Sequence, residues 1–395
     1  MQSRISSLSV RREPVFNTAE IGVALAGFSV FLNLYSTQSI LPFLASLFHA
    51  SALEVSQTVG AVTFAVTLAA PFVGPISDLF GRKRIIVIAS FALVLLTALV
   101  ATSQTLSQLI AWRFAQGLLL PAVFGVTVAY IAEEWRGRNV GRAMGRYVAG
   151  NVLGGVTGRL ISGYVATHLG WRQSFLALGG LSLLSALGVV KLLPASRAFV
   201  PEPGLRALLG SLGSHLRNAK LGMTCVVGFN ILFSIVATFT YVNFYLAAPP
   251  YSLNSAALGL VFLVYIAGIP ASIVSGSFLD RVGYRMAFVS AMLVSALGVF
   301  LTGFVGYLWG ILLGLALCAS GIFVCQSAAN SYLGASHPRA RASAAGIYVS
   351  CYYLGGTVGA VAPGLVWAHG GWTACVALIL SVQLATVLLV WKFWR

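Results

Sequence analysis

The chain has 395 residues, of which 58% are hydrophobic and 8% are charged, and its mean hydropathy of +0.92 excludes a soluble globular domain. Its 24 Lys and Arg residues outnumber its 8 Asp and Glu residues and give a net charge of +16. In a soluble protein this charge would suggest a nucleic-acid partner, so the position of the basic residues decides its meaning.

Twelve apolar stretches reach about the 20 residues that a helix needs to cross the hydrocarbon of a bilayer. Short breaks rich in Gly, Pro, Ser and Arg separate them. We therefore predict an all-α integral membrane protein with twelve transmembrane helices. The expected spans are 19–46, 53–77, 85–103, 107–132, 142–166, 172–193, 221–247, 255–279, 286–304, 307–333, 342–367 and 371–391.

The basic residues are divided unevenly between the two sides of these spans. With the N-terminus inside, 21 of the 24 Lys and Arg residues are cytoplasmic, and only Arg172 is clearly outside. This positive-inside pattern indicates orientation and contact with anionic headgroups, and it argues against a nucleic-acid partner. We expect both termini in the cytoplasm and no removable signal peptide in the polar tail 1–18.

The segment 194–220 divides the spans into two groups of six, 19–193 and 221–395. Its prolines are followed by leucines on one helical face, which predicts an amphipathic helix on the cytoplasmic leaflet; a plain solvated linker is the alternative. These leucines are Leu205, Leu208, Leu209, Leu212 and Leu216.

A shift of 201 residues aligns the two groups across spans 5 and 11. Gly154 and Gly155 align with Gly355 and Gly356, and the same shift aligns further glycines and aromatic residues. Upstream, a shift of 202 aligns a second set. The sequence therefore predicts two parallel six-helix repeats with the substrate path between them.

The residues that end span 2 carry a recognisable motif: Gly74, Asp78, Gly81, Arg82, Lys83 and Arg84. They resemble the loop motif of the major facilitator superfamily, and a weaker copy recurs as Gly276, Asp280, Gly283 and Arg285. Within the family the chain is most similar to the YnfM-type bacterial inner-membrane proteins, grouped with drug and sugar efflux permeases. The resemblance implies the family's fold and a multi-pass location in the bacterial inner (plasma) membrane.

The resemblance also implies a conformational latch. Asp78 would accept hydrogen bonds at the start of span 11, where a helix N-terminus favours an anion. The basic residues would pair with Glu133 or Glu134 and, with Asp78 and its counterpart Asp280, hold the outward-facing state. The alternative is ordinary positive-inside charge beside a helix-ending glycine.

Two arginines lie within predicted spans at a similar depth. Arg113, with Gln116 and Gly117, resembles a family pattern associated with cavity polarity and proton coupling. An arginine in the hydrocarbon should face a wet cavity or a partner, so Arg113 is the leading site candidate; the alternative is that it only ties span 4 to carbonyls of span 1. Arg159 follows glycines that resemble the efflux motif of span 5.

Those glycines are Gly150, Gly154, Gly155 and Gly158. Small residues at this spacing allow close helix approach, so we expect them at the interface between the halves; simple packing of spans 5 and 11 is the alternative.

Polar residues on three further spans are candidate ligand-facing groups, although each could equally serve interhelical packing. They are Asn33, Tyr35 and Gln38 on span 1, Asn230 and Tyr241 on span 7, and Gln326 and Asn330 on span 10.

No Asp, Glu or His lies at the middle of a predicted span, and the five cysteines show no metal-ligand spacing. We therefore expect no metal and no cofactor, and a substrate that is anionic, zwitterionic or neutral rather than cationic. An enzyme would lack its usual intramembrane groups.

The predicted function is secondary active transport of a small organic solute by alternating access, in the form of export by proton antiport. Uniport, or import or exchange of an anionic metabolite, is the alternative, and a sensor or scaffold without transport is a third. We expect a monomer in the lipid bilayer, with protons as the possible coupling ion.

Overall fold

The structure is a computed structural model that describes residues 13–135, 139–196, 219–336 and 341–394. Every regular element in these ranges is a helix. The amphipathic helix predicted in the linker falls mainly on 197–218 and lies outside the described residues. The elements are α1 (Glu13–Leu34), η1 (Gln38–Ile40), α2 (Leu41–Phe48), α3 (Ala52–Phe80), α4 (Arg82–Val100), α5 (Leu106–Glu134), α6 (Val140–His168), α7 (Trp171–Leu192), α9 (Ala219–Ala247), α10 (Ser255–Val261), η2 (Phe262–Ala267), α11 (Gly268–Phe304), α12 (Leu308–Ser336) and α13 (Arg341–Phe393).

Nine helical stretches of the described chain are long and apolar enough to cross a membrane. The three remaining spans of the twelve predicted are also helical in the structure. Span 142–166 lies in α6, whose apolar character is lowered by three arginines, and span 255–279 begins as the short apolar stretch Ser255–Ala271. The last two spans share α13, which breaks at Gly370 and Gly371.

Local sequence explains where several helices begin and end. The Ser51 side chain accepts from the backbone N–H of Glu54, and the Glu54 carboxylate accepts from the backbone N–H of Ser51, so a capping box starts α3. The helix ends at Gly81, whose φ of 88° is readily available to glycine. Gly283, which aligns with Gly81, has a φ of 78° and divides α11 in the same way.

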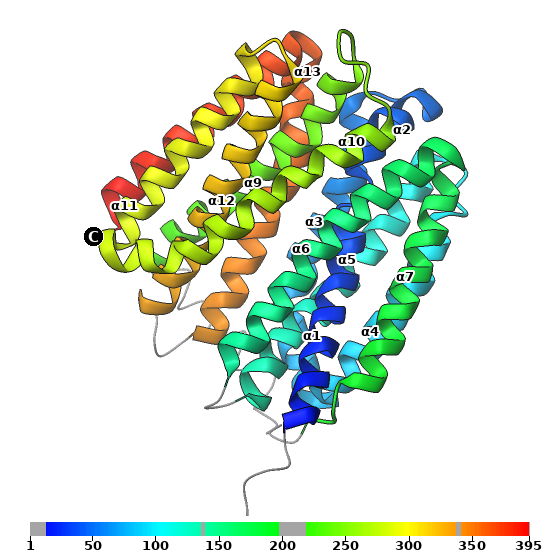
Figure 1. The fold of residues 1–395 in the computed structure, drawn as a ribbon, viewed down its shortest axis with the longest axis vertical. Coiled ribbons are helices and arrows are strands. Elements are labelled where there is room, and N and C mark those ends of the chain that lie inside the picture. Colours follow the sequence, from blue (N-terminus) through cyan, green and yellow to red (C-terminus); the bar gives the residue numbers. More distant parts are fainter. Residues whose placement is uncertain (1–12, 136–138, 197–218, 337–340, 395) are drawn as a thin grey trace, which may run out of the picture.

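The helices form two groups that lie side by side (Figure 1). The first contains α1 to α7, coloured blue to green, and the second contains α9 to α13, coloured green to red. Within the groups, equivalent helices pack in equivalent ways. A Cβ built on Gly154 would overlap the carbonyl of Phe28, and one on Gly355 would overlap the carbonyl of Phe229, 201 residues later in both cases. The fold is therefore a duplicated helical bundle.

The two groups meet at the end that carries α2 and α10 (Figure 1). The Thr63 and Thr357 hydroxyls lie 3.1 Å apart near the middle of this contact. Closer to its end, a Cβ on Gly364 would lie 2.8 Å from Leu53. The contacts between the halves thus extend from Thr63, within α3, to the end predicted to be outside.

The opposite end, which is the predicted cytoplasmic one, is open around its described glycines. Gly74 and Gly81 of the first half, and Gly276 and Gly346 of the second, have no atom within 4 Å of a Cβ position. The described contacts between the two groups therefore lie at the end that carries α2 and α10, and these four glycines at the opposite end lack close neighbours.

Candidate functional site

Arg113, on α5, is completely buried inside the first half. Its Nη1 donates to the carbonyl of Asn33 at 2.8 Å and to Oε1 of Gln116 at 2.7 Å, and its Nη2 donates to the carbonyl of Leu34 at 2.7 Å. Its Nε donates to the carbonyl of Thr58 at 3.3 Å. The guanidinium therefore joins three helices of one half.

The position of α1 explains this network. Because α1 ends at Leu34, its last carbonyls lack N–H donors within the helix, and a cation is favoured at that end. Asn33 extends the network: its Nδ2 donates to Ser182, its Oδ1 accepts from Thr97, and the Thr97 hydroxyl also accepts from Gln116. This geometry favours the alternative role for Arg113, a tie between span 4 and the carbonyls of span 1.

Arg159, on α6, lies at the contact between the halves and is 5% exposed. Its Nε donates to Oε1 of Gln38 at 2.9 Å, and its Nη1 donates to the carbonyl of Gly155 at 2.7 Å. Three aromatic rings surround the guanidinium. Its Cζ lies 5.0 Å from the ring centroid of Tyr35, 4.6 Å from that of Phe262 and 5.2 Å from that of Tyr265.

Both halves contribute to this cluster around Arg159. Tyr35 and Gln38 belong to the first half, whereas Phe262 and Tyr265 lie on η2 of the second. Nε2 of Gln38 donates to Oγ1 of Thr240 on α9 at 3.1 Å, which links the halves directly. The structure thus brings together three predicted site residues, Tyr35, Gln38 and Arg159, at the expected interface.

Arg159 has no carboxylate partner in the described part of the chain. The ion pairs seen there lie near the predicted cytoplasmic end and involve Glu20, Asp78 and Glu133. Cation–π contacts stabilise the charge by about 0.5 to 2 kcal/mol each but do not neutralise it. A buried cation with free donors between two halves is a site that an anion would complete.

Sequence reasoning missed Phe262 and Tyr265. They lie in an apolar run where an aromatic residue is indistinguishable from one that faces lipid or core. Their spacing of three was the available signal, because it puts both rings on one side of a tight helical turn.

The candidate residues of spans 7 and 10 lie apart from Arg159. Tyr241 is buried and donates from its hydroxyl to the carbonyl of Ala360 at 2.8 Å. Asn230 is buried at 8% exposure, Gln326 is half-buried and Asn330 is exposed. None of these three amides has a described hydrogen bond to Arg159, so their role in substrate binding stays a prediction.

The glycines of α6 differ from expectation in what they contact. Cβ atoms on Gly150, Gly154 and Gly158 would overlap the carbonyls of Ala24, Phe28 and Leu32 on α1. The prediction that these glycines form the interface between the halves is therefore wrong for these three: they allow α1 and α6 to pack closely within one half. Gly155 instead lies beside Arg159, since its Cβ would be 3.3 Å from Nη1.

The residues of the predicted latch form a cluster inside the first half. Nη1 of Arg82 lies 2.5 Å from Oδ1 of Asp78, and its Nη2 lies 2.8 Å from Oε1 of Glu133. The backbone N–H of Lys83 donates to Ser196 at 3.4 Å, and Arg84 is exposed. These pairs lie within one half and do not themselves join the two halves, so the role of the latch in holding the outward-facing state stays a prediction.

The remaining latch contacts are not described. Residues 337–340, which precede span 11, lie outside the described chain, so the predicted contact of Asp78 with that helix stays a prediction. Glu134 lies at the last residue of α5, Asp280 is exposed on α11, and Gly74 lies in the open region described above.

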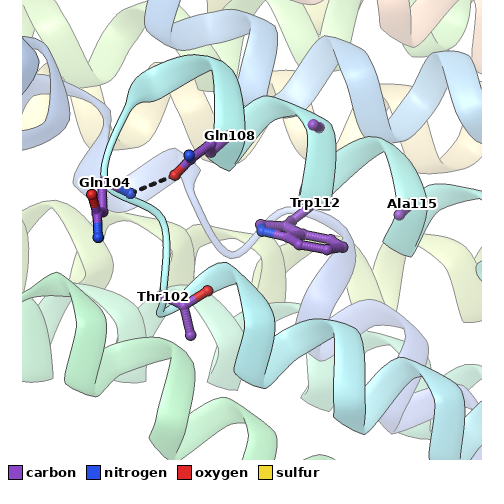
Figure 2. A pocket seen from close by; sticks show the side chains of 6 residues that line it. Thr102, Gln104, Gln108, Trp112 and Ala115 are labelled. Atoms are coloured by element: carbon purple, nitrogen blue, oxygen red, sulfur yellow. Dashed lines mark hydrogen bonds between the residues drawn. The ribbon is translucent and has the colours of Figure 1, made fainter.

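A hollow of about 480 Å³ lies elsewhere, between the end of α4 and the start of α5, on the side predicted to be outside (Figure 2). Trp112 and Gln108 line it, and the side chain of Gln108 accepts a hydrogen bond from the backbone N–H of Gln104 at 2.9 Å. It contains no charged side chain, and only the first half lines it. It therefore lacks the features of a site shared by two halves.

No group of three or more His, Cys, Asp or Glu residues that could hold a metal occurs among the described residues.

The sequence matches the family model described as Major Facilitator Superfamily over residues 23–360 and 251–395. It is 32% identical to the inner membrane transport protein YnfM of Escherichia coli, over 95% of this chain and 90% of that protein. It is also 32% identical to the uncharacterized MFS-type transporter YybF of Bacillus subtilis, over 95% of this chain and 93% of that protein. Its fold is similar to that of a variant of the nucleoside transporter NupG, with a TM-score of 0.78, 14% identity and coverage of 95% and 100%.

Proposed function

The chain belongs to the major facilitator superfamily of membrane transporters, and we propose that it carries a small organic anion that pairs with Arg159 between its two halves. It is a multi-pass membrane protein and a transporter, not an enzyme. One observation carries the proposal: the buried guanidinium of Arg159 has free donors and no described carboxylate partner at the contact of the halves.

The location of Arg159 suits alternating access. A substrate that arrives from the predicted cytoplasmic end would reach the guanidinium where the first half meets Phe262 and Tyr265 of the second. When the halves separate at the outer end, those rings would leave Arg159, and the anion would be exposed to the outside. The same side chain would thus meet the substrate in both states.

For direction and coupling we propose export by proton antiport from the bacterial inner membrane, with both termini cytoplasmic. Uniport, or import or exchange of an anionic metabolite, is the second candidate. The acidic side chains described close to Arg82, at the predicted cytoplasmic end, would have to carry any coupled proton, since no described carboxylate contacts Arg159.

The test is a thermal-shift screen of anionic, zwitterionic and neutral metabolites on the purified protein, followed by counterflow of each hit in proteoliposomes. We expect anionic hits that accumulate by counterflow in liposomes containing the protein and not in empty ones. Hits restricted to neutral or cationic solutes would overturn the anion assignment, and binding without counterflow would favour a sensor or scaffold.

Direction is tested separately with a pH jump across the vesicle wall. Proton antiport predicts that an inward proton gradient accelerates outward flux of the anion. Flux that ignores the gradient in both directions would replace antiport by uniport or exchange.

A further inference from the structure

The unused donors around Arg159 define the shape of its ligand. A guanidinium has five N–H donors in one plane, and the protein uses two of them, at Gln38 and Gly155. One N–H on Nη1 and both on Nη2 therefore lack an acceptor in the described residues. Two of these can bind both oxygens of one carboxylate, the bidentate arrangement that this planar fork favours.

Two phenols add further donors at the same place. The hydroxyls of Tyr35 and Tyr265 make no hydrogen bond with a described residue, although both rings lie within 5.2 Å of the Arg159 Cζ. An acceptor-rich anion is the ligand that this set of donors would satisfy.

Aromatic rings cover the surroundings of the guanidinium and continue from it. Phe239 stacks on Tyr265 with centroids 4.5 Å apart, and Phe323 lies 5.8 Å from Tyr265. Phe323 is half-buried, whereas Phe262 is completely buried. A ligand bound in the plane of the guanidinium would therefore extend its body between rings and toward a partly exposed ring.

From this geometry we infer that the substrate is an aryl carboxylate, a planar aromatic ring that carries its acid group directly. The inference rests on the proposed function. The carboxylate would lie coplanar with the guanidinium, and the conjugated ring would share that plane and stack against the neighbouring side chains. A saturated ring is thicker and cannot stack, and a tetrahedral phosphonate places one oxygen out of the plane, so both fit less well.

The experiment is counterflow in proteoliposomes with radiolabelled benzoate as the probe and three unlabelled competitors. Cyclohexanecarboxylate keeps the acid and loses the planar ring, phenylphosphonate keeps the ring and has a tetrahedral acid, and benzyl alcohol keeps the ring without charge. Unlabelled benzoate is the reference competitor, and we expect it to compete at concentrations about tenfold lower than any of the three, the ratio that one aromatic contact supplies.

Variants assign the selectivity to the rings. Phe262→Leu should reduce the preference for benzoate over cyclohexanecarboxylate to about threefold or less, because the ring closest to the guanidinium is lost. The control is Phe300→Leu, which removes a ring that is 44% exposed and stacks on Phe304 away from the site. This control should keep the wild-type ratio.

Equal competition by benzoate and cyclohexanecarboxylate in the wild-type protein would overturn the aryl inference and leave the anion transporter intact. Preference for phenylphosphonate would overturn the inference that the acid group of the substrate is planar. If no carboxylate drives counterflow while neutral solutes do, the proposed function fails as well. The wild-type ratios decide these outcomes even if Phe262→Leu does not fold.

Discussion

Two arginines buried in the membrane differ in what surrounds them, and the difference distinguishes a structural role from a ligand-binding role. Arg113 donates four hydrogen bonds inside one half, three of them to backbone carbonyls. Arg159 donates two and lies among aromatic rings of both halves. Arg113 uses four of its five N–H donors and holds helices together, whereas Arg159 uses two of five at the contact of the halves and is available to a ligand. Depth in the membrane alone does not distinguish the two roles.

The largest effect on stability is expected for Arg113→Met. The carbonyls of Asn33, Leu34 and Thr58 would each lose a hydrogen bond from the guanidinium, and a hydrogen bond to a charged group contributes about 1.5 to 3 kcal/mol. The variant should lose most of its folded, monodisperse fraction in detergent, measured by size exclusion after a heating series.

The control for this prediction is Arg172→Met, at an exposed arginine with one hydrogen bond to Ser103. It should keep the wild-type profile. Wild-type stability of Arg113→Met together with lost transport would reverse the comparison and make Arg113 the ligand site.

A smaller loss is expected for Gly154→Ala. Its Cβ would overlap the carbonyl oxygen of Phe28 on α1, and overpacking of this kind costs about 1 to 3 kcal/mol. Gly145→Ala, on the same helix, is the matched control because no atom lies within 4 Å of its Cβ position. Thermal unfolding should show a lower midpoint for the first variant and an equal or higher one for the second. Equal midpoints would contradict the packing of α1 on α6.

These two predictions show what the sequence could and could not reveal. The fold follows from composition and repeated glycines, because both are local properties of the chain. The role of Arg113 depends on where α1 ends, and the sequence predicts one continuous span over 19–46 where the structure ends α1 at Leu34. That break exposes the carbonyls that Arg113 caps.

The candidate site was partly predictable for the same reason. Polar residues stand out within an apolar span, so Tyr35, Gln38 and Arg159 could be identified one by one. Their grouping depends on packing between the two halves. Phe262 and Tyr265, which join the cluster, lie 103 and 106 residues after Arg159 in the chain. No local pattern records that contact.

A change in conformational balance is expected for Gln38→Leu. The side chain accepts from Arg159 and donates to Thr240 across the halves, and one net hydrogen bond of about 1 kcal/mol shifts a two-state equilibrium about fivefold. Spin labels at the exposed outer positions Leu169 and Trp309 should report a larger population of long distances.

The control for this shift is Gln104→Leu, at an exposed position on the outer surface that bridges no halves. It should leave the distance distribution unchanged. An unchanged distribution in Gln38→Leu as well would mean that the bridge to Thr240 does not help to close the outer end.

The smallest effect on stability is expected for Arg159→Gln. The substitution removes two hydrogen bonds but also removes a buried charge without a described carboxylate partner, so the two contributions oppose each other. The free energy of unfolding should stay within about 1 kcal/mol of the wild-type value, or rise, which thermal unfolding would measure as an equal or higher midpoint. A collapse like that of Arg113→Met would make both arginines structural.

The most direct test of the ligand role of Arg159 is counterflow of a labelled organic anion in proteoliposomes containing wild-type protein, Arg159→Lys or Arg159→Gln. Loss of a bidentate, charge-assisted pair predicts that Arg159→Gln slows anion exchange about a hundredfold, with Arg159→Lys between it and wild type. Near wild-type anion exchange by a well-folded Arg159→Gln would contradict the assignment of Arg159 as the anion site.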